Sequence, residues 1–209
     1  MSILNRLSSQ TGDRTEQSNR EAAAECVHNP ELLKEIAGAL TGKNTALVGD
    51  CAEVMTMTAE KRPESVSPHI DALVPLLAHK TTRVRWEATH AIAYVARFVP
   101  EQMKALLPRL AEMIRKDTST IVRDYSIDAV GNASSIGEAY AEIAFPILKE
   151  ALTAWDGKHA GRVLAGLVQV VKSKPALSLE VLQIGTEYAD HAKPVVRKAA
   201  KKLVEEAKR

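Results

Sequence analysis

Apolar residues recur every three to four positions along most of this chain, in segments separated by short polar turns. At 100° per residue, one side of the segment that begins at Val84 is apolar; it comprises Val84, Ala88, Ala91, Ile92, Val95 and Phe98. The same offsets from Ala160 and from Val196 again select apolar residues. No window shows the clear alternation of period two that a half-buried strand would need. The pattern therefore predicts an all-α protein.

A helix-start marker, mostly Pro-Glu, recurs with a much longer period. It stands at residues 30, 63, 100, 137 and 175, which are 33, 37, 37 and 38 residues apart. Proline suits the first helical position, whose N–H has no partner, and glutamate there complements the helix dipole. Each marker begins one amphipathic segment, and a second one follows after a polar turn. Repeated helix pairs of this kind predict an α-solenoid.

The markers also predict the organisation of the chain. We expect a frayed segment over residues 1–15 and a single repeat domain over residues 16–209. Within it, we expect a capping helix and five helix pairs, over 16–29, 30–62, 63–99, 100–136, 137–174 and 175–209. The register of the fourth second helix is open, because Ala160 and Gly161 both serve as its reference. In the N-terminal segment, Ile3, Leu4 and Leu7 could cover an end of the array or a dimer contact.

The second helices share a Val-Arg motif that small residues follow, at Val84-Arg85, Val122-Arg123 and Val196-Arg197. Prolines stand within the first helices at 68, 108 and 146. An aspartate precedes the arginine in three turns, as Asp117/Arg123, Asp156/Arg162 and Asp190/Arg197. On these motifs, residues 30–209 resemble the HEAT-repeat family. The resemblance implies an all-α, right-handed superhelix of about five HEAT-like pairs with an extra N-terminal capping helix. It also implies that these arginines bond the turn aspartate and neighbouring carbonyl groups.

Composition narrows the class of protein further. The chain has 209 residues, 28 Lys+Arg against 26 Asp+Glu, and only 4% aromatic residues. No apolar run approaches the roughly 20 residues of a membrane helix, and no signal peptide is evident. The two cysteines suit a reducing compartment, so we expect a cytoplasmic protein without membrane contact. Residues 193–209 are basic, and we interpret them as a solvated cap, with phosphate or an acidic partner as the alternative.

Catalytic and metal-binding motifs are missing from the sequence. The segment 38–45 resembles a phosphate-binding loop, but it has three residues between its glycines where four are needed. We interpret Gly42 as a left-handed cap at a helix end. Three histidines, His79, His159 and His191, fall in equivalent turns, and we interpret them as a solvated edge. We expect no catalytic residue, no metal site and no cofactor.

The side of each second helix opposite the apolar side is polar, and in HEAT-like solenoids it lines the concave, usually binding, surface. In the first repeat it carries Asp50, Val54, Met57 and Lys61. In the last three repeats it carries Asp124, Asp128, Gly131 and Ser135, then Arg162, Gly166, Gln169 and Ser173, then Lys198, Lys202, Glu205 and Arg209. The predicted partner-binding residues are Trp86, His90, Tyr94, Arg97, Asp124, Asp128 and Arg162, because tryptophan and arginine dominate interface hot spots. Alternatively, Trp86 packs across the adjacent unit, and the aspartates only form salt bridges with Arg97 and Arg162.

Three functions are compatible with these patterns. The first is a non-enzymatic protein–protein interaction scaffold that binds an unknown protein or peptide on its concave face. The second is nucleic-acid binding, or an activity like that of HEAT-like DNA glycosylases, against which the net charge of only +2 counts. The third is a lyase-like, bilin-handling protein, because bilin lyases contain related repeats. We favour the scaffold, not an enzyme, and we favour a monomer.

Overall fold

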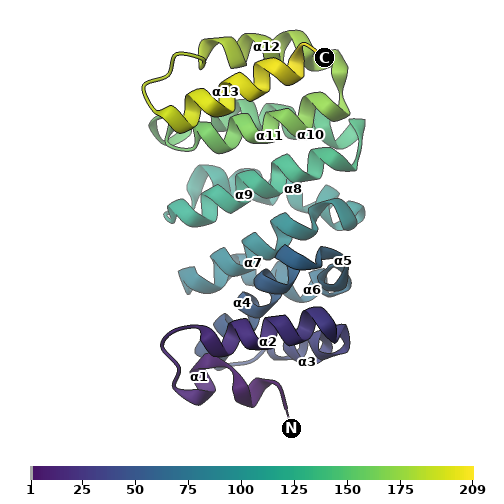
Figure 1. Ribbon diagram of the computed structural model, residues 1–209, viewed down its shortest axis with the longest axis vertical. Helices are drawn as coiled ribbons and strands as arrows, with labels where there is room; N and C mark the ends of the chain where they lie inside the picture. The colour runs from purple at the N-terminus through teal and green to yellow at the C-terminus, as the bar shows by residue number, and fades with distance from the viewer. Residues whose placement is uncertain (1) are drawn as a thin grey trace. The chain divides into compact units, whose positions relative to one another are not determined.

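The computed structural model describes residues 2–209, and it is helical throughout, with no strand in that range. The helices form two compact units that meet in sequence between Val99 and Pro100 (Figure 1). This division coincides with the predicted boundary between the second and third repeats. Between Ser2 and Arg209, no helix is both long and apolar enough to cross a membrane.

The first unit contains a long capping helix and two helix pairs. Its elements are η1 (Leu4–Arg6), α1 (Ser8–Thr11), α2 (Gln17–His28), η2 (Pro30–Leu32), α3 (Leu33–Ala39), α4 (Thr45–Lys61), α5 (Pro63–Val66), η3 (Ser67–His69), α6 (Ile70–Leu73), η4 (Val74–Ala78), α7 (Thr82–Val95) and η5 (Ala96–Phe98), where η marks a 3-10 helix. The second helices α4 and α7 pack against each other, and α2 packs against α4. The capping helix thus occupies the place of a preceding second helix.

The second unit contains three helix pairs. Its elements are α8 (Pro100–Lys116), α9 (Thr120–Ala133), η6 (Ser134–Ile136), α10 (Glu138–Ala151), η7 (Ala154–Gly157), α11 (Ala160–Ser173), η8 (Pro175–Leu177), α12 (Ser178–Glu187) and α13 (Pro194–Ala207). Each first helix packs on its own second helix, and α11 lies between α9 and α13 (Figure 1). The second helices of this unit therefore form a continuous three-helix layer.

The predicted periodicity is confirmed at the level of elements. The second helices α7, α9, α11 and α13 begin within two residues of Val84, Val122, Ala160 and Val196. The open register of α11 is resolved in favour of Ala160, which is buried together with Leu164, Leu167 and Val171. The spacing of apolar residues thus located both the helices and the sides that they bury.

The first helix of the second repeat differs from the prediction of one continuous helix. It is broken into α5, η3, α6 and η4, and Pro68 and Pro75 stand at the starts of the two 3-10 segments. Proline lacks the N–H that an α-helix requires and clashes with the preceding turn. Single prolines are tolerated elsewhere, because Pro108 and Pro146 lie inside the continuous helices α8 and α10.

The prediction of a frayed N-terminal segment is wrong for residues 2–11; Met1 lies outside the described residues. Residues 4–6 and 8–11 are helical, and Ile3 and Leu7 are 1% and 0% exposed. Polar contacts support this packing, since the Ser2 hydroxyl donates to Glu35 of α3. Burial of two aliphatic side chains at the end of the first unit outweighs the entropy cost of ordering this short segment.

The glycine that resembles part of a phosphate-binding loop also differs from the prediction. Gly42 does not have the positive φ of a left-handed cap, in contrast to Gly12. The next helix begins instead with a side-chain cap, because Asn44 Oδ1 accepts hydrogen bonds from the N–H groups of residues 46 and 47. Asparagine at the end of this segment is therefore explained by helix capping.

Candidate functional site

A groove crosses the three-helix layer of the second unit. Its volume is about 210 Å³, and it is lined by Asp128, Gly131, Asn132, Ala165, Gly166, Val168, Gln169, Ala199 and Lys202. These residues come from α9, α11 and α13. Five of them, Asp128, Gly131, Gly166, Gln169 and Lys202, belong to the polar side that the helical phase predicted. The groove therefore lies on the predicted face of the second helices.

Two glycines bring α9 and α11 unusually close beneath this groove. A Cβ atom built on Gly131 would lie 2.8 Å from the Cα atom of Gly166. One built on Gly166 would lie 3.3 Å from the Cα atom of Gly131 and 3.2 Å from Leu148 of α10. Backbone therefore meets backbone here, and only glycine at position 131 permits that approach.

The charges on the α9 and α11 sides of the groove are paired. Arg162 forms an ion pair with Asp128, and its Nε atom lies 3.4 Å from Oδ1 of Asp124. Burial raises the pKa of Asp128, the negative charge of Asp124 raises it further, and the Arg162 charge opposes both effects. The structure thus brings together the three predicted site residues of this unit.

Behind this ion pair lies a buried histidine. His159 is 2% exposed, and its Nδ1 atom lies 2.7 Å from Oδ1 of Asp124. Arg123 Nε donates to His159 Nε2 at 3.0 Å. Because an arginine Nε can only donate, Nε2 accepts and Nδ1 carries the proton that is donated to Asp124. The interpretation of this histidine as part of a solvated edge is therefore wrong; it is buried and hydrogen-bonded to Asp124.

The arginines of the Val-Arg motif bond to carbonyl groups of the preceding turn, in line with the family resemblance. Arg123 donates to the carbonyl oxygen of Asp117 at 2.6 Å, and Arg85 and Arg197 make equivalent bonds to residues 79 and 191. Arg162 departs from this pattern, since it forms ion pairs with Asp124 and Asp128 of α9. Arg162 follows a glycine, whereas the other three arginines follow a valine, and its structural role differs as well.

Trp155 covers Arg123 from the outside. The guanidinium carbon lies 3.8 Å from the centroid of the indole ring, and Trp155 Nε1 donates to the carbonyl oxygen of Ile114 at 2.9 Å. Both Trp155 and Asp156 have positive φ, which is strained for residues other than glycine. The contacts of the indole ring help to hold this turn in place next to the buried Arg123–His159 pair.

In the first unit, the predicted site residues lie along α7 and η5. Trp86 is half-buried, and its Nε1 atom donates to Glu87 Oε1 at 2.6 Å. The rings of His90 and Tyr94 lie 4.7 Å apart, whereas Arg97 is exposed and lies over the ring of its neighbour Phe98. The structure thus pairs His90 with Tyr94 and holds the edge of Trp86 against a buried carboxylate.

The polar side of the first repeat is covered rather than open. Asp50 and Val54, which the helical phase places on that side, are 2% and 0% exposed. Their assignment to an open face is therefore wrong. Asp50 Oδ2 accepts a hydrogen bond from the backbone N–H of Ser9, so the N-terminal segment packs against this part of α4. The sequence pattern contained no signal for that contact, because it joins residues 41 positions apart.

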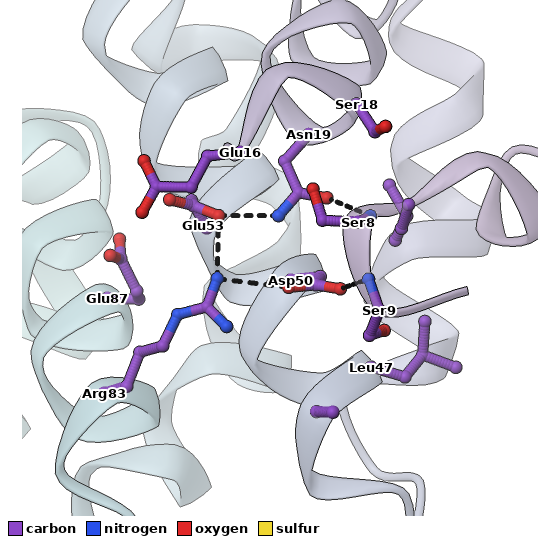
Figure 2. A network of polar contacts seen from close by, with 12 residues as sticks. Ser8, Ser9, Glu16, Ser18, Asn19, Leu47, Asp50, Glu53, Arg83 and Glu87 are labelled. Atoms are coloured by element: carbon purple, nitrogen blue, oxygen red, sulfur yellow. Dashed lines mark hydrogen bonds and ion pairs between the residues drawn. The ribbon is translucent and has the colours of Figure 1, made fainter. Parts of the chain in front are cut away.

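Arg83 is the centre of a polar network in this unit, drawn in Figure 2. Reaching from α7, it lies 3.1 Å from Asp50 Oδ1 and 2.8 Å from Glu53 Oε2. Asn19 of α2 donates to the same Glu53 oxygen at 2.6 Å and accepts from the N–H of Ser8. The network therefore ties α1, α2, α4 and α7 together through buried polar groups.

The two carboxylates in this network differ in their titration. Burial raises the pKa of Asp50, but hydrogen bonds from Ser9 and the charge of Arg83 bring it below its ordinary value. Burial also raises the pKa of Glu53, and there the hydrogen bond from Asn19 and the charge of Arg83 do not offset it. A cavity of about 250 Å³ borders the network, and Asp50 and Arg83 line it. The network's hydrogen bonds are internal, so we assign it a structural role.

Metal and thiol chemistry find little support in the structure. No group of three or more His, Cys, Asp or Glu side chains in the part of the chain that the structure describes is arranged to hold a metal ion. Cys26 and Cys51 are buried free thiols, and burial raises their pKa values to about 11 and about 12. Thiols of this kind are protonated at neutral pH and therefore react poorly as nucleophiles.

Comparisons with known proteins place the fold. No protein-family model and no curated protein matches the sequence. A designed armadillo repeat protein solved in complex with the peptide (KR)4 has a TM-score of 0.73 and 17% identity, with 98% of each chain covered. An engineered protein has a TM-score of 0.70 and 16% identity, covering 100% of this chain and 97% of its own. Designed armadillo repeat proteins described as made for modular peptide recognition have a TM-score of 0.67 and 16% identity, with 98% of each chain covered.

These likenesses extend over the entire chain at low sequence identity, so they bear on architecture. They agree with the repeated helix pairs and with the side-by-side packing of second helices within each unit. The protein has the all-α fold of HEAT- and armadillo-like helical repeat proteins.

Proposed function

We propose that this protein is a non-enzymatic binding scaffold that captures an extended peptide segment of a partner protein on the polar side of its second helices. The observation that carries the proposal is the groove across α9, α11 and α13, with four polar side chains in its lining. The fold supports it as well, since a structurally similar designed protein was solved with a bound peptide.

The dimensions of the groove suit a short extended segment. Packed helices lie about 8–10 Å apart, so a path from α9 over α11 to α13 spans about 16–20 Å. An extended chain rises about 3.3 Å per residue. The groove therefore accommodates about five or six residues. The small side chains of Ala165 and Ala199 leave space for the peptide between the polar groups of the lining.

The lining offers hydrogen-bonding groups that complement a peptide backbone. Asn132 and Gln169 each carry an amide that both donates and accepts, Asp128 accepts, and Lys202 donates. An extended segment outside a sheet has N–H and C=O groups that need such partners when they leave water. Recognition through the backbone of an extended peptide is a recurrent mode of binding.

The residues predicted from the sequence have different roles in this proposal. Arg162 and Asp124 hold Asp128 in position at the edge of the groove. In the first unit, Trp86, His90 and Tyr94 of α7 and Arg97 of η5 form a further surface for contact with a protein. Tryptophan and arginine side chains are frequent anchors of protein interfaces.

Selection from a random peptide library displayed on phage tests the proposal. Wild-type protein should enrich a set of peptides, and Ala165→Trp should abolish that enrichment, because an indole placed on an exposed alanine of the lining fills the groove. Ala176→Trp is the matched control, since Ala176 is exposed in η8 and outside the groove. Circular dichroism establishes that both variants are folded.

The proposal fails if the wild-type protein enriches no peptides, or if Ala165→Trp retains the enriched set as well as Ala176→Trp does. Retention by both variants would place any binding site away from the groove.

A further inference from the structure

The charges around the groove are not balanced from one side to the other. On α9 and α11, Asp128 is paired with Arg162, and Asp124 is bonded to His159 and close to Arg162. On α13, Lys202 is exposed, and within residues 2–209 neither Glu205 nor any other carboxylate forms an ion pair with it. Of the two charged residues that line the groove, Asp128 is thus paired with Arg162, and Lys202 on α13 has no ion pair among the described residues.

Further features of α13 add to this positive potential. Lys198 stands one helical turn before Lys202 and is also exposed, so the two ammonium groups project from neighbouring positions on one face of the helix. On the opposite side of the groove, burial raises the pKa of Asp128, and Arg162 compensates its charge. Repulsion of an incoming anion from the α9 side is thereby reduced.

We infer that the groove selects an acidic peptide segment, with the side-chain carboxylate of an aspartate or glutamate bound by Lys202 and the adjoining peptide backbone bound by Gln169 and Asn132. The inference rests on the proposed function and adds the chemistry of the partner to it. A bound carboxylate forms an ion pair with Lys202, the only charged residue of the lining that has none within residues 2–209. A basic segment would instead place its cations against Lys202.

The predicted preference is opposite to that implied by the charge of the peptide in the similar designed protein, which was solved with the basic peptide (KR)4. Fold similarity alone therefore does not lead to this inference; it comes from the placement of Lys202 in the lining. The difference also makes the sign of the charge preference a sharp test.

The experiment compares the composition of the peptides selected in a phage-display library and then tests single charge reversals. Peptides that wild type enriches and Ala165→Trp loses should be rich in Asp and Glu relative to the input library. A selected peptide, acetylated and amidated so that only side-chain carboxylates remain, is titrated by fluorescence anisotropy. Its Kd should rise tenfold or more with Lys202→Glu. With Lys201→Glu it should change by less than about twofold, since Lys201 is equally exposed but outside the groove.

The outcomes separate the inference from the proposed function. A groove-dependent set of peptides that is neutral or basic overturns the inference and leaves the proposed function standing. Equal weakening by Lys201→Glu and Lys202→Glu also overturns it, because diffuse attraction to the basic α13 would explain both. If no peptide set depends on the groove, the proposed function itself is wrong. Loss of binding with Lys202→Glu, together with recovery when the acidic residues of the peptide are replaced by lysine, supports the inference.

Discussion

At the scale of single residues, burial changes the chemistry of ordinary side chains in this protein. Glu87 is 9% exposed, and burial raises the pKa of its carboxyl group, although the hydrogen bond from Trp86 opposes the rise. For a carboxyl whose pKa is higher in the folded than in the unfolded state, folding is favoured while the group is protonated. The stability that protonation contributes is lost as the pH rises from the pKa of the unfolded state through the pKa of the folded state. Glu87 therefore lowers stability at neutral pH.

Glu87→Gln should accordingly stabilise the protein at pH 8 and have little effect near pH 4, where the glutamate is largely protonated in both states. The amide oxygen can still accept the hydrogen bond from Trp86 Nε1. We expect a gain of about 1 kcal/mol at pH 8, the size of a typical single-substitution effect, and a rise in Tm of about 2–4 °C. Thermal unfolding at both pH values measures it.

Glu21→Gln is the control for this prediction, because Glu21 is exposed on α2. A gain in Tm for Glu87→Gln that is the same at pH 4 and pH 8, or no larger than that of Glu21→Gln, would show that ionisation of Glu87 does not cost stability.

At the scale of elements, the residues at the contact between two neighbouring second helices decide how closely the helices pack. In the second unit, Gly131 and Gly166 let the backbones of α9 and α11 meet, and the groove lies over that contact. In the first unit, α4 and α7 are instead joined by the charged groups of Arg83, Asp50 and Glu53. The same helix pairing is thus stabilised by backbone contact in one unit and by a buried polar network in the other.

Gly131→Ala should destabilise the protein by about 1–3 kcal/mol, the usual cost of overpacking. Its Cβ atom would lie 2.8 Å from the Cα atom of Gly166, which is backbone and cannot rotate away. Gly38→Ala, within α3 and with no atom within 4 Å of the added Cβ, should stabilise by about 0.5–1 kcal/mol, because alanine is the better helix former. Urea unfolding compares the two variants.

If Gly131→Ala is as stable as Gly38→Ala, the close approach of α9 and α11 is not a requirement of the fold. The groove would then not depend on the contact between Gly131 and Gly166.

At the scale of the whole molecule, the first and the last described helical segments bury apolar residues in different ways. The N-terminal end buries Ile3 and Leu7 from a short helical segment. The C-terminal helix α13 buries Val196, Ala200 and Leu203 and exposes a row of lysines. The exposed lysines of α13 include Lys202, which this helix contributes to the groove.

Leu7→Ala tests whether the N-terminal segment contributes to stability. We expect a loss of about 2–4 kcal/mol in the free energy of unfolding, as for other fully buried leucines, together with faster hydrogen exchange in α2, against which η1 and α1 pack. The same substitution at Leu179, which is 82% exposed, should cost less than about 0.5 kcal/mol. Equal stability of the two variants would restore the description of residues 2–11 as frayed.

Local signals determined much of this structure. The marker prolines and glutamates, the Val-Arg motif and the apolar spacing predicted the repeats, the start of each second helix and the buried side of α11, because each acts within a few residues of sequence. The polar side of the second helices was predicted in the same way, and Asp128, Gln169 and Lys202 do line a groove there.

Which polar residues stay open to a partner was decided only by the tertiary structure. Helical phase assigns a residue to a side of its own helix, but it contains no information about what covers that side. Asp50 is covered by a segment 41 residues away, and His159 is buried between Arg123 and Asp124 of another helix. The approach of Gly131 to Gly166 likewise joins two helices. The sequence by itself therefore determined the elements and their faces, whereas packing between distant segments decided which faces were closed and where the groove remained.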